Sequence, residues 1–202
     1  MNETEAPIPD PSWGAKLALR DQLLTTRRRI PPAELGARAL AVAAIALAQS
    51  EVRLAATVAA YVSVGHEPGT GPLLDALTGA GKRVILPILL PDLDLDWAAY
   101  TGASSLVSAG RGLLEPAGTR LGVEALGTAD LVIVPGLAVD RSGMRLGRGG
   151  GSYDRALTRA TGPVWCLLNA DEVLEVVPSG QHDRRVHAAL TPDGMNRFHR
   201  AR

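Results

Sequence analysis

Four glycines and two arginines lie close together in the ten-residue segment RLGRGGGSYD, which runs from Arg145 to Asp154. Glycine adopts positive φ angles at little cost and lets a ligand approach the backbone closely. Consecutive amides that point the same way form a concavity that attracts anions, and neighbouring guanidinium groups add full positive charges. These residue types and spacings predict a phosphate-binding loop. The alternative is a flexible glycine turn between a strand and a helix.

Two common nucleotide-binding motifs do not match this segment. The P-loop pattern G-x-x-x-x-G-K-[ST] is absent, and the dinucleotide pattern G-x-G-x-x-G, begun at Gly147, finds Ser152 at its last position. The dinucleotide pattern also requires a strand immediately before the glycines, and we expect none there. The loop is therefore predicted to bind phosphate without belonging to either motif.

Asp154 follows the glycines in SYDRALTRAT, residues 152–161, which predicts a helix. The partial positive charge at the N-terminus of that helix would add to the attraction for phosphate. A carboxylate beside a phosphate site often holds magnesium, which offsets the like charges, but an aspartate in a first helical turn also complements the helix dipole. The residues alone leave both interpretations of Asp154 open.

Helix-like and strand-like segments alternate along the rest of the chain. Helices are predicted at residues 13–29, 33–49 and 72–81. Strands are predicted at residues 57–64, 82–89, 93–100, 130–136 and 163–169. Residues 171–178 are predicted to form a short helix or a turn. The segment DLVIVPG, residues 130–136, has the short, continuously apolar character of a central parallel strand.

This alternation predicts an α/β fold: a single domain with a mainly parallel sheet and helices on both faces, in a Rossmann-like three-layer arrangement. We assign residues 1–12 to a flexible tail, because they are acidic and rich in proline, and residues 13–202 to the domain. Ligands of such sheets bind beyond the carboxyl ends of the strands. Three polar loops should converge there: residues 65–71, residues 136–152 and the segment after Leu168.

Charge and cysteine content restrict the class of protein. Lysine plus arginine and aspartate plus glutamate each total 21, so neither a nucleic-acid partner nor a membrane partner is expected. The single cysteine, Cys166, lies in the apolar run PVWCLL and is predicted to be a buried, unreactive side chain. With no disulfide possible within the chain, we expect a cytoplasmic protein, and we expect it to be monomeric.

The longer segment VPGLAVDRSGMRLGRGGGSYDR resembles the 5-formyltetrahydrofolate cyclo-ligase family, which carries VPG, RLGxGxGYYD and the intervening aspartate and glycine in this order. Further landmarks of the family match YVSVGHEPGTGPLLDAL, GKRVILP, GLLEP and VPSGQHDRRVHAALTPDG. The resemblance extends from Lys16 to about Thr191. It implies an ATP- and magnesium-dependent cyclisation of 5-formyltetrahydrofolate to 5,10-methenyltetrahydrofolate, in which the formyl oxygen is first phosphorylated, with release of ADP and phosphate.

The resemblance also implies the residues that bind ATP. Lys16 and Arg20, four positions apart on one helical face, would reach the phosphates together. The loop would enclose the nucleotide through Arg145, Leu146, Gly147, Arg148, Gly149, Gly150, Gly151, Ser152 and Tyr153. Within this set, the catalytic groups would be Arg145 and Arg148, together with Asp154.

Substrate and metal residues follow from the same resemblance. Asp154 and Asp183 would be the magnesium carboxylates, and Glu67 would accept hydrogen bonds from the amino and ring N–H edge of the pterin. The partners would thus be ATP and a reduced folate. The substrate pocket would be formed by Val62, Glu67, Arg148, Gly149, Gly150, Gly151 and Ser152.

Two positions depart from the family pattern. Ser152 stands where the family has a tyrosine, and Arg148 stands where a tyrosine or lysine is common. The loss of an aromatic group that could enclose folate leaves two alternatives open. One is a paralogous ATP-dependent kinase or ligase of the same fold that acts on another substrate. The other is a non-catalytic protein that retains the nucleotide-binding loop.

Overall fold

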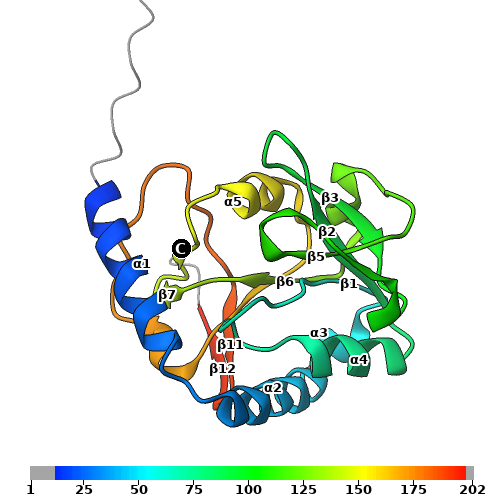
Figure 1. Ribbon diagram of the computed structural model, residues 1–202, viewed down its shortest axis with the longest axis horizontal. Helices are drawn as coiled ribbons and strands as arrows, with labels where there is room; N and C mark the ends of the chain where they lie inside the picture. Colours follow the sequence, from blue (N-terminus) through cyan, green and yellow to red (C-terminus); the bar gives the residue numbers. More distant parts are fainter. Residues whose placement is uncertain (1–11, 199–202) are drawn as a thin grey trace, which may run out of the picture.

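The computed structural model describes residues 12–198, and its centre is a seven-stranded sheet with the strand order β12-β11-β9-β6-β1-β2-β3 (Figure 1). The predicted tail, residues 1–12, lies outside the described residues except for Ser12. The strands of this sheet are β1 (Thr57–Ala59), β2 (Arg83–Leu89), β3 (Leu95–Ala99), β6 (Leu131–Pro135), β9 (Val164–Leu167), β11 (Ala188–Thr191) and β12 (Gly194–Arg197).

The sheet is mainly parallel, as predicted. Strands β1, β2, β6, β9 and β11 pair with one another in parallel, and the two edge strands, β3 and β12, run antiparallel to their neighbours. The C-terminal hairpin of β11 and β12 was not predicted, because AALT and GMNR show neither apolar alternation nor a long apolar run. Of the predicted strand 57–64, only Thr57–Ala59 is regular.

Three of the long helices lie within two residues of their predicted bounds. Helix α2 begins at a proline, which is favourable at the first helical position because that residue needs no amide partner. No single helix in residues 12–198 is long and apolar enough to cross a membrane; α1 and α2 meet that test only together, across a bend of 104°. The helices are α1 (Trp13–Arg27), α2 (Pro32–Leu47), α3 (Ser50–Leu54), α4 (Gly71–Gly79) and α5 (Ser152–Ala156).

Helices cover both faces of the sheet, which confirms the predicted three layers (Figure 1). Helices α2 and α4 cover one face, and α5 covers the other with the 3-10 segments η3 (Val123–Thr128) and η4 (Leu157–Arg159). In β6, Leu131 and Ile133 pack toward α2 and α4, whereas Val132 and Val134 pack toward α5. Strand β6 is continuously apolar because both of its faces are buried.

The order of the strands creates a crevice beside β1. From β1 the chain passes through α4 to β2 on one side, and it later returns to β6 on the other side. The loops that leave β1 and β6 therefore diverge from neighbouring strands. Ligands of open α/β sheets bind at such a switch point.

Smaller elements surround this crevice. Helix α1 packs on the small sheet of β7 (Ala138–Asp140), β8 (Arg145–Leu146) and β10 (Val173–Leu174). The predicted helix or turn at 171–178 is instead the 3-10 segment η5 (Ala170–Glu172) followed by β10. The remaining elements are the hairpin of β4 (Leu106–Ser108) and β5 (Leu114–Pro116), and the 3-10 segments η1 (Ala103–Ser105) and η2 (Gly110–Gly112).

A buried ion pair fixes the end of α1 against the central sheet. Arg27 Nε lies 2.6 Å from Glu172 Oε1, and Arg27 Nη2 lies 2.7 Å from Glu172 Oε2. Arg27 Nη2 also donates to the carbonyl of Gly136, directly after β6, at 2.7 Å. Both side chains are almost fully buried, at 2% and 3% exposed. The pair thus ties α1 to the carboxyl end of β6.

We expect Arg27→Met to lower the free energy of unfolding by about 3–5 kcal/mol, because it leaves the Glu172 carboxylate buried without its partner. Arg141→Met is the matched control: Arg141 pairs with Glu175 at 2.5 Å, but these side chains are 75% and 74% exposed. That loss should not exceed about 1 kcal/mol. Urea denaturation measures both values, and equal losses in the two variants would contradict the prediction.

Candidate active site

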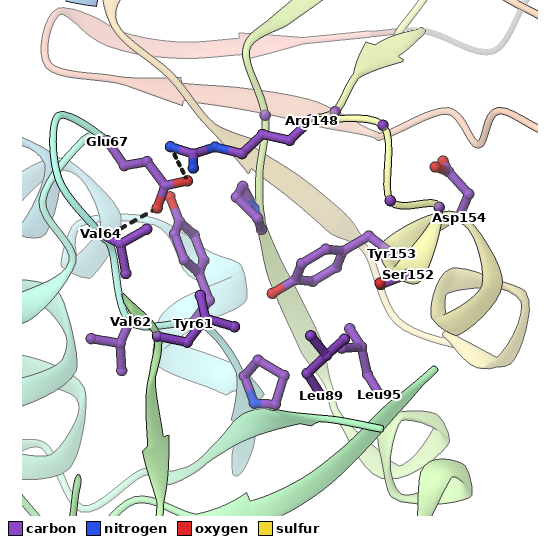
Figure 2. A pocket seen from close by; sticks show the side chains of 18 of the residues that line it. Tyr61, Val62, Val64, Glu67, Leu89, Leu95, Arg148, Ser152, Tyr153 and Asp154 are labelled. Atoms are coloured by element: carbon purple, nitrogen blue, oxygen red, sulfur yellow. Dashed lines mark hydrogen bonds and ion pairs between the residues drawn. The ribbon is translucent and has the colours of Figure 1, made fainter. Parts of the chain in front are cut away.

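A cavity of about 240 Å³ opens beyond the carboxyl ends of β1, β2 and β6. Figure 2 shows Glu67 and Arg148 at one end of this cavity and Leu89 and Leu95 at the other. Two of the three loops predicted to converge, residues 65–71 and 136–152, contribute to its wall. The segment after Leu168 does not line it and supports Arg27 instead.

Most residues predicted for the site line this one cavity. Leu146 does not, because its side chain is buried in the apolar cluster beneath α1. Lys16, Arg20 and Asp183 are not on the cavity wall: Arg20 contacts the loop at Gly147, whereas Lys16 and Asp183 contact each other. The predicted residues on the wall are Val62, Glu67, Arg145, Gly147, Arg148, Gly149, Gly150, Gly151, Ser152, Tyr153 and Asp154.

The glycine loop begins directly after β8, so the expectation that no strand precedes it was wrong. A two-residue strand has too few residues to show a pattern in the sequence. Gly149 and Gly151 have φ angles of 99° and 70°, which side chains rarely adopt. Among the hydrogen bonds of residues 12–198, none has an amide of residues 147–151 as its donor. This amide-rich turn has the character of an anion site.

The helix after the loop is shorter than predicted. Instead of residues 152–161, α5 covers only Ser152–Ala156 and continues as the 3-10 segment η4. A single turn aligns few peptide dipoles, so the helix end contributes less positive charge than expected. Attraction for an anion therefore depends on the loop amides and on the cationic side chains around them.

Arg145 is held rigidly behind the glycine loop. Its side chain is buried, Nη1 donates to the Pro135 carbonyl at 3.1 Å, and Nη2 lies 2.9 Å from Asp154 Oδ1. Its guanidinium carbon also lies 5.9 Å from the centre of the Tyr153 ring. Burial and the nearby Glu67 carboxylate raise the pKa of the Tyr153 phenol, which therefore stays protonated. Arg145 thus provides a fixed positive charge to this wall.

Asp140 shapes the hairpin that delivers Arg145. Burial alone would raise the pKa of this carboxyl, but hydrogen bonds from Ser142, Met144 and Val177 hold it below its ordinary value. The ionised carboxylate closes the turn between β7 and β8. Strand β8 ends directly before Gly147, the first glycine of the loop. The turn between β7 and β8 therefore fixes where the glycine loop starts.

Helix α1 brings one cation to the glycine loop and another to the Asp183 segment. Arg20 Nε donates to the Gly147 carbonyl at 2.9 Å, and a Cβ atom at Gly149 would lie 3.5 Å from the guanidinium carbon of Arg20. Lys16 Nζ lies 2.6 Å from Asp183 Oδ2. The helix therefore connects the glycine loop with the Asp183 segment, although the two are far apart in sequence.

The two predicted metal carboxylates have different surroundings. Asp154 Oδ1 accepts hydrogen bonds from Arg145 and from the amide of Arg184, and Asp183 Oδ2 accepts them from Lys16 and the amide of Gly180. No group of three or more histidine, cysteine, aspartate or glutamate side chains in residues 12–198 could hold a metal. Magnesium usually takes one or two carboxylates plus phosphate oxygens and water. The donors present therefore fit magnesium that arrives with a nucleotide.

Glu67 and Arg148, both assigned to the substrate pocket by the family resemblance, contact each other. Arg148 Nη2 lies 3.2 Å from Glu67 Oε1, and the amide of Val64 donates to Glu67 Oε2 at 2.9 Å (Figure 2). The carboxylate is 7% exposed, whereas the arginine side chain is 52% exposed. The half-exposed arginine head group can turn toward another partner, but the buried carboxylate then needs a replacement donor. Glu67 is thus a fixed acceptor and Arg148 its movable partner.

The apolar wall of the cavity was missed by the sequence analysis. GLLEP served only as a landmark of the family resemblance, and the strands that contribute the other residues read as ordinary sheet. For the residues near the ends of β1, β2 and β6, that position was the signal that could have identified them. Leu95 at the start of β3 and the residues of β5 carried no such signal. The residues concerned are Tyr61, Val64, Pro87, Leu89, Leu95, Leu113, Leu114, Glu115, Pro135 and Gly136.

Fold and site together define a class: an α/β protein whose cavity, at the switch point of a mainly parallel sheet, joins a cationic glycine loop to a buried carboxylate. The family model of the 5-formyltetrahydrofolate cyclo-ligase family matches residues 13–192. The chain belongs to this family.

Sequence relatives agree with that assignment. The chain is 42% identical over 186 residues to a protein of Mycolicibacterium smegmatis named 5-formyltetrahydrofolate cyclo-ligase, with 88% of this chain and 94% of the relative covered. An Escherichia coli protein of the same name is 37% identical over 147 residues, covering 70% of this chain and 80% of the relative. The similarity extends along nearly the whole length of the first relative.

Solved structures show the same fold. The structure of the 5,10-methenyltetrahydrofolate synthetase of Aquifex aeolicus matches with a TM-score of 0.79 and 28% identity, over 93% of this chain and 94% of that one. The 5,10-methenyltetrahydrofolate synthetase of Mycoplasma pneumoniae matches with a TM-score of 0.69 and 17% identity, over 88% and 98% of the two chains. The second likeness supports the fold alone.

We expect Gly136→Ala to disturb the floor of the site, because its Cβ would lie 2.4 Å from the sulfur of Cys166 and 3.5 Å from Arg145 Cγ. The free energy of unfolding should fall by about 1–3 kcal/mol. Burial raises the pKa of the Cys166 thiol to about 12, so a disulfide reagent should not label the native wild-type protein. The variant should become reactive as the thiol is displaced.

Gly36→Ala is the control for this substitution. Gly36 lies within α2, and a Cβ atom added there would have no other atom within 4 Å. The change should therefore stabilise the protein by about 0.5–1 kcal/mol. Thermal unfolding and thiol labelling report both variants. Unchanged stability and labelling in Gly136→Ala would show that the close contact does not constrain the site.

Proposed function

We propose that this protein uses ATP and magnesium to cyclise 5-formyltetrahydrofolate to 5,10-methenyltetrahydrofolate, with release of ADP and phosphate. The observation that carries the proposal is that one cavity is lined by both the glycine loop and the buried Glu67 carboxylate. The loop suits an anion, and the carboxylate suits the N–H donors of a pterin. Family membership supports the same reaction.

Positioning of the two substrates is the main task of the protein in this reaction. Lys16, Arg20 and the loop amides would hold the triphosphate, while Glu67 would orient the pterin so that its formyl oxygen faces the γ-phosphorus. The apolar wall at Leu89 and Leu95 would exclude water from the reacting atoms.

The reaction would proceed in two displacements. The formyl oxygen attacks the γ-phosphorus, the bond to the β-phosphate oxygen breaks, and ADP leaves; the product is a phosphorylated formyl group, an imino-phosphate. N10 of the folate then attacks the formyl carbon, the carbon–oxygen bond breaks, and phosphate and the N10 proton leave. Arg145 and Arg148 would stabilise the negative charge on the transferred phosphoryl group.

Asp154 and Asp183 would hold magnesium with the nucleotide. Bound there, the metal would neutralise charge on the phosphate oxygens. In each of these carboxylates, one oxygen accepts all the hydrogen bonds that come from residues 12–198. The second oxygen of each carboxylate accepts none from these residues. Lys16 and Arg145 would keep these carboxylates in place, because each already contacts one of them.

The wild-type protein should convert 5-formyltetrahydrofolate in the presence of ATP and magnesium, seen as new near-ultraviolet absorbance. Asp154→Asn should lower kcat/KM by about 10- to 100-fold and shift the magnesium dependence to higher concentration, because a metal carboxylate is lost. Asp171→Asn, at an exposed position outside the cavity wall, is the control and should behave as wild type.

Two results would contradict the proposal. The first is that the protein binds nucleotide, and loses that binding in Lys16→Ala, but does not turn over the folate. This result would favour a kinase or ligase that acts on another substrate, which is the alternative raised by Ser152. If neither ATP nor the folate raised Tm, the protein would be a non-catalytic relative, since a ligand of the native state stabilises it by mass action.

A further inference from the structure

Tyr61 is a buried cavity residue whose hydroxyl lacks a partner. It lies two residues after the end of β1, at the switch point of the sheet, and only 4% of the residue is exposed. Its ring lines the cavity, yet its hydroxyl makes no hydrogen bond with any described residue. Buried hydroxyls are nearly always hydrogen-bonded, and leaving one unpaired is unfavourable. This arrangement points to a hydrogen bond that forms with a ligand.

Other buried polar atoms without a partner in residues 12–198 do not offer the same opportunity. Trp97 Nε1 and Arg159 Nε do not line the cavity. Arg145 lines it, but its two terminal nitrogens are already engaged by Pro135 and Asp154. Among these four side chains, Tyr61 is therefore the one that both lines the cavity and has no hydrogen-bond partner for its polar group.

The hydroxyl of Tyr61 is directed toward Glu67, whose charge acts on the phenol. Figure 2 shows the ring rising between Val62 and Arg148 so that its oxygen points toward the Glu67 carboxylate. Burial first, and the Glu67 charge second, raise the pKa of this phenol well above its ordinary value. The hydroxyl therefore keeps its proton at any pH at which the protein works. It is a neutral donor beside a fixed acceptor.

We propose that the Tyr61 hydroxyl is a further substrate-binding group, which donates a hydrogen bond to a ring acceptor of the pterin. The inference rests on the proposed function. If Glu67 accepts from the amino group and the ring N–H of the pterin, the next polar atom on either side is an acceptor: the ring carbonyl oxygen or the unprotonated ring nitrogen. A donor beside the carboxylate matches that order of groups.

The pair would therefore recognise a donor–donor–acceptor edge rather than a single charge. Arg148, the movable partner of Glu67, would release the carboxylate when the pterin enters, whereas Tyr61 would gain its first hydrogen bond. Before the ligand binds, the Tyr61 hydroxyl has no hydrogen-bond partner among the described residues. Its hydrogen bond to the pterin therefore replaces no hydrogen bond with these residues. Tyr61 thereby favours the bound state without stabilising the ligand-free protein.

Tyr61→Phe tests this role, with Tyr100→Phe as the matched control. Tyr100 is also a buried residue, at 6% exposed, but its hydroxyl donates to Asp75 Oδ1 at 3.2 Å and it does not line the cavity. Tyr61→Phe should raise KM for 5-formyltetrahydrofolate by about 3- to 10-fold, leave KM for ATP unchanged, and leave Tm of the ligand-free protein equal or higher. Tyr100→Phe should leave both KM values unchanged and lower Tm.

The outcomes separate this inference from the proposed function. Turnover by the wild-type protein with an unchanged folate KM in Tyr61→Phe would overturn the inference alone. A lower Tm of ligand-free Tyr61→Phe with an unchanged folate KM would also overturn it, because it would show a structural role. A rise in KM for ATP alone would overturn it as well, because it would place the hydroxyl at the nucleotide. Absence of turnover by the wild-type protein would overturn the proposed function, and the inference with it.

Discussion

The buried pair of Arg27 and Glu172 is the contact on which the architecture of the site depends. Helix α1 lies outside the layers that cover the central sheet and packs its apolar side chains on a small sheet of short strands. Without a firm attachment, its two cations would have no fixed position relative to the glycine loop. The pair provides that attachment, because its two charges are removed from water together and hydrogen bonds with Gly136 and Asn169 hold them in place. Desolvation makes such a pair costly to break, so the helix and the end of β6 move as one unit.

Around the cavity, cations and carboxylates neutralise one another before any ligand binds. Lys16 contacts Asp183, Arg145 contacts Asp154, and Arg148 contacts Glu67. These pairs differ in exposure, and the difference gives each a distinct capacity. The buried Arg145 keeps its contacts and acts as a fixed charge. The half-exposed Arg148 can turn away from Glu67 once another donor takes its place at that buried carboxylate. A polyanion entering beside the loop would therefore meet one preorganised charge and one that can turn toward it.

Much of the site could be predicted because its residues are contiguous. The glycine loop carries its own signal in composition, and Lys16 and Arg20 are placed on one face by helical spacing alone. The structure places Arg20 against the loop at Gly147 and Lys16 against Asp183. The strand before the loop was missed because two residues show no periodicity, and the helix after it ended early. The Glu67–Arg148 contact could not be predicted either, since it joins loops from opposite sides of the switch point.

The sequence by itself determined the local chemistry: a loop of glycines that admits positive φ angles, an apolar run that must be a buried strand, and carboxylates that follow strands. These properties depend on neighbours within a few residues. Only the tertiary structure decided which groups are buried and whether they have partners, because both depend on atoms brought together from distant segments. Tyr61 illustrates the difference. In the sequence it is an aromatic residue within the predicted strand 57–64, and only in the folded chain does its hydroxyl lie buried, without a partner among the described residues, and directed toward a carboxylate.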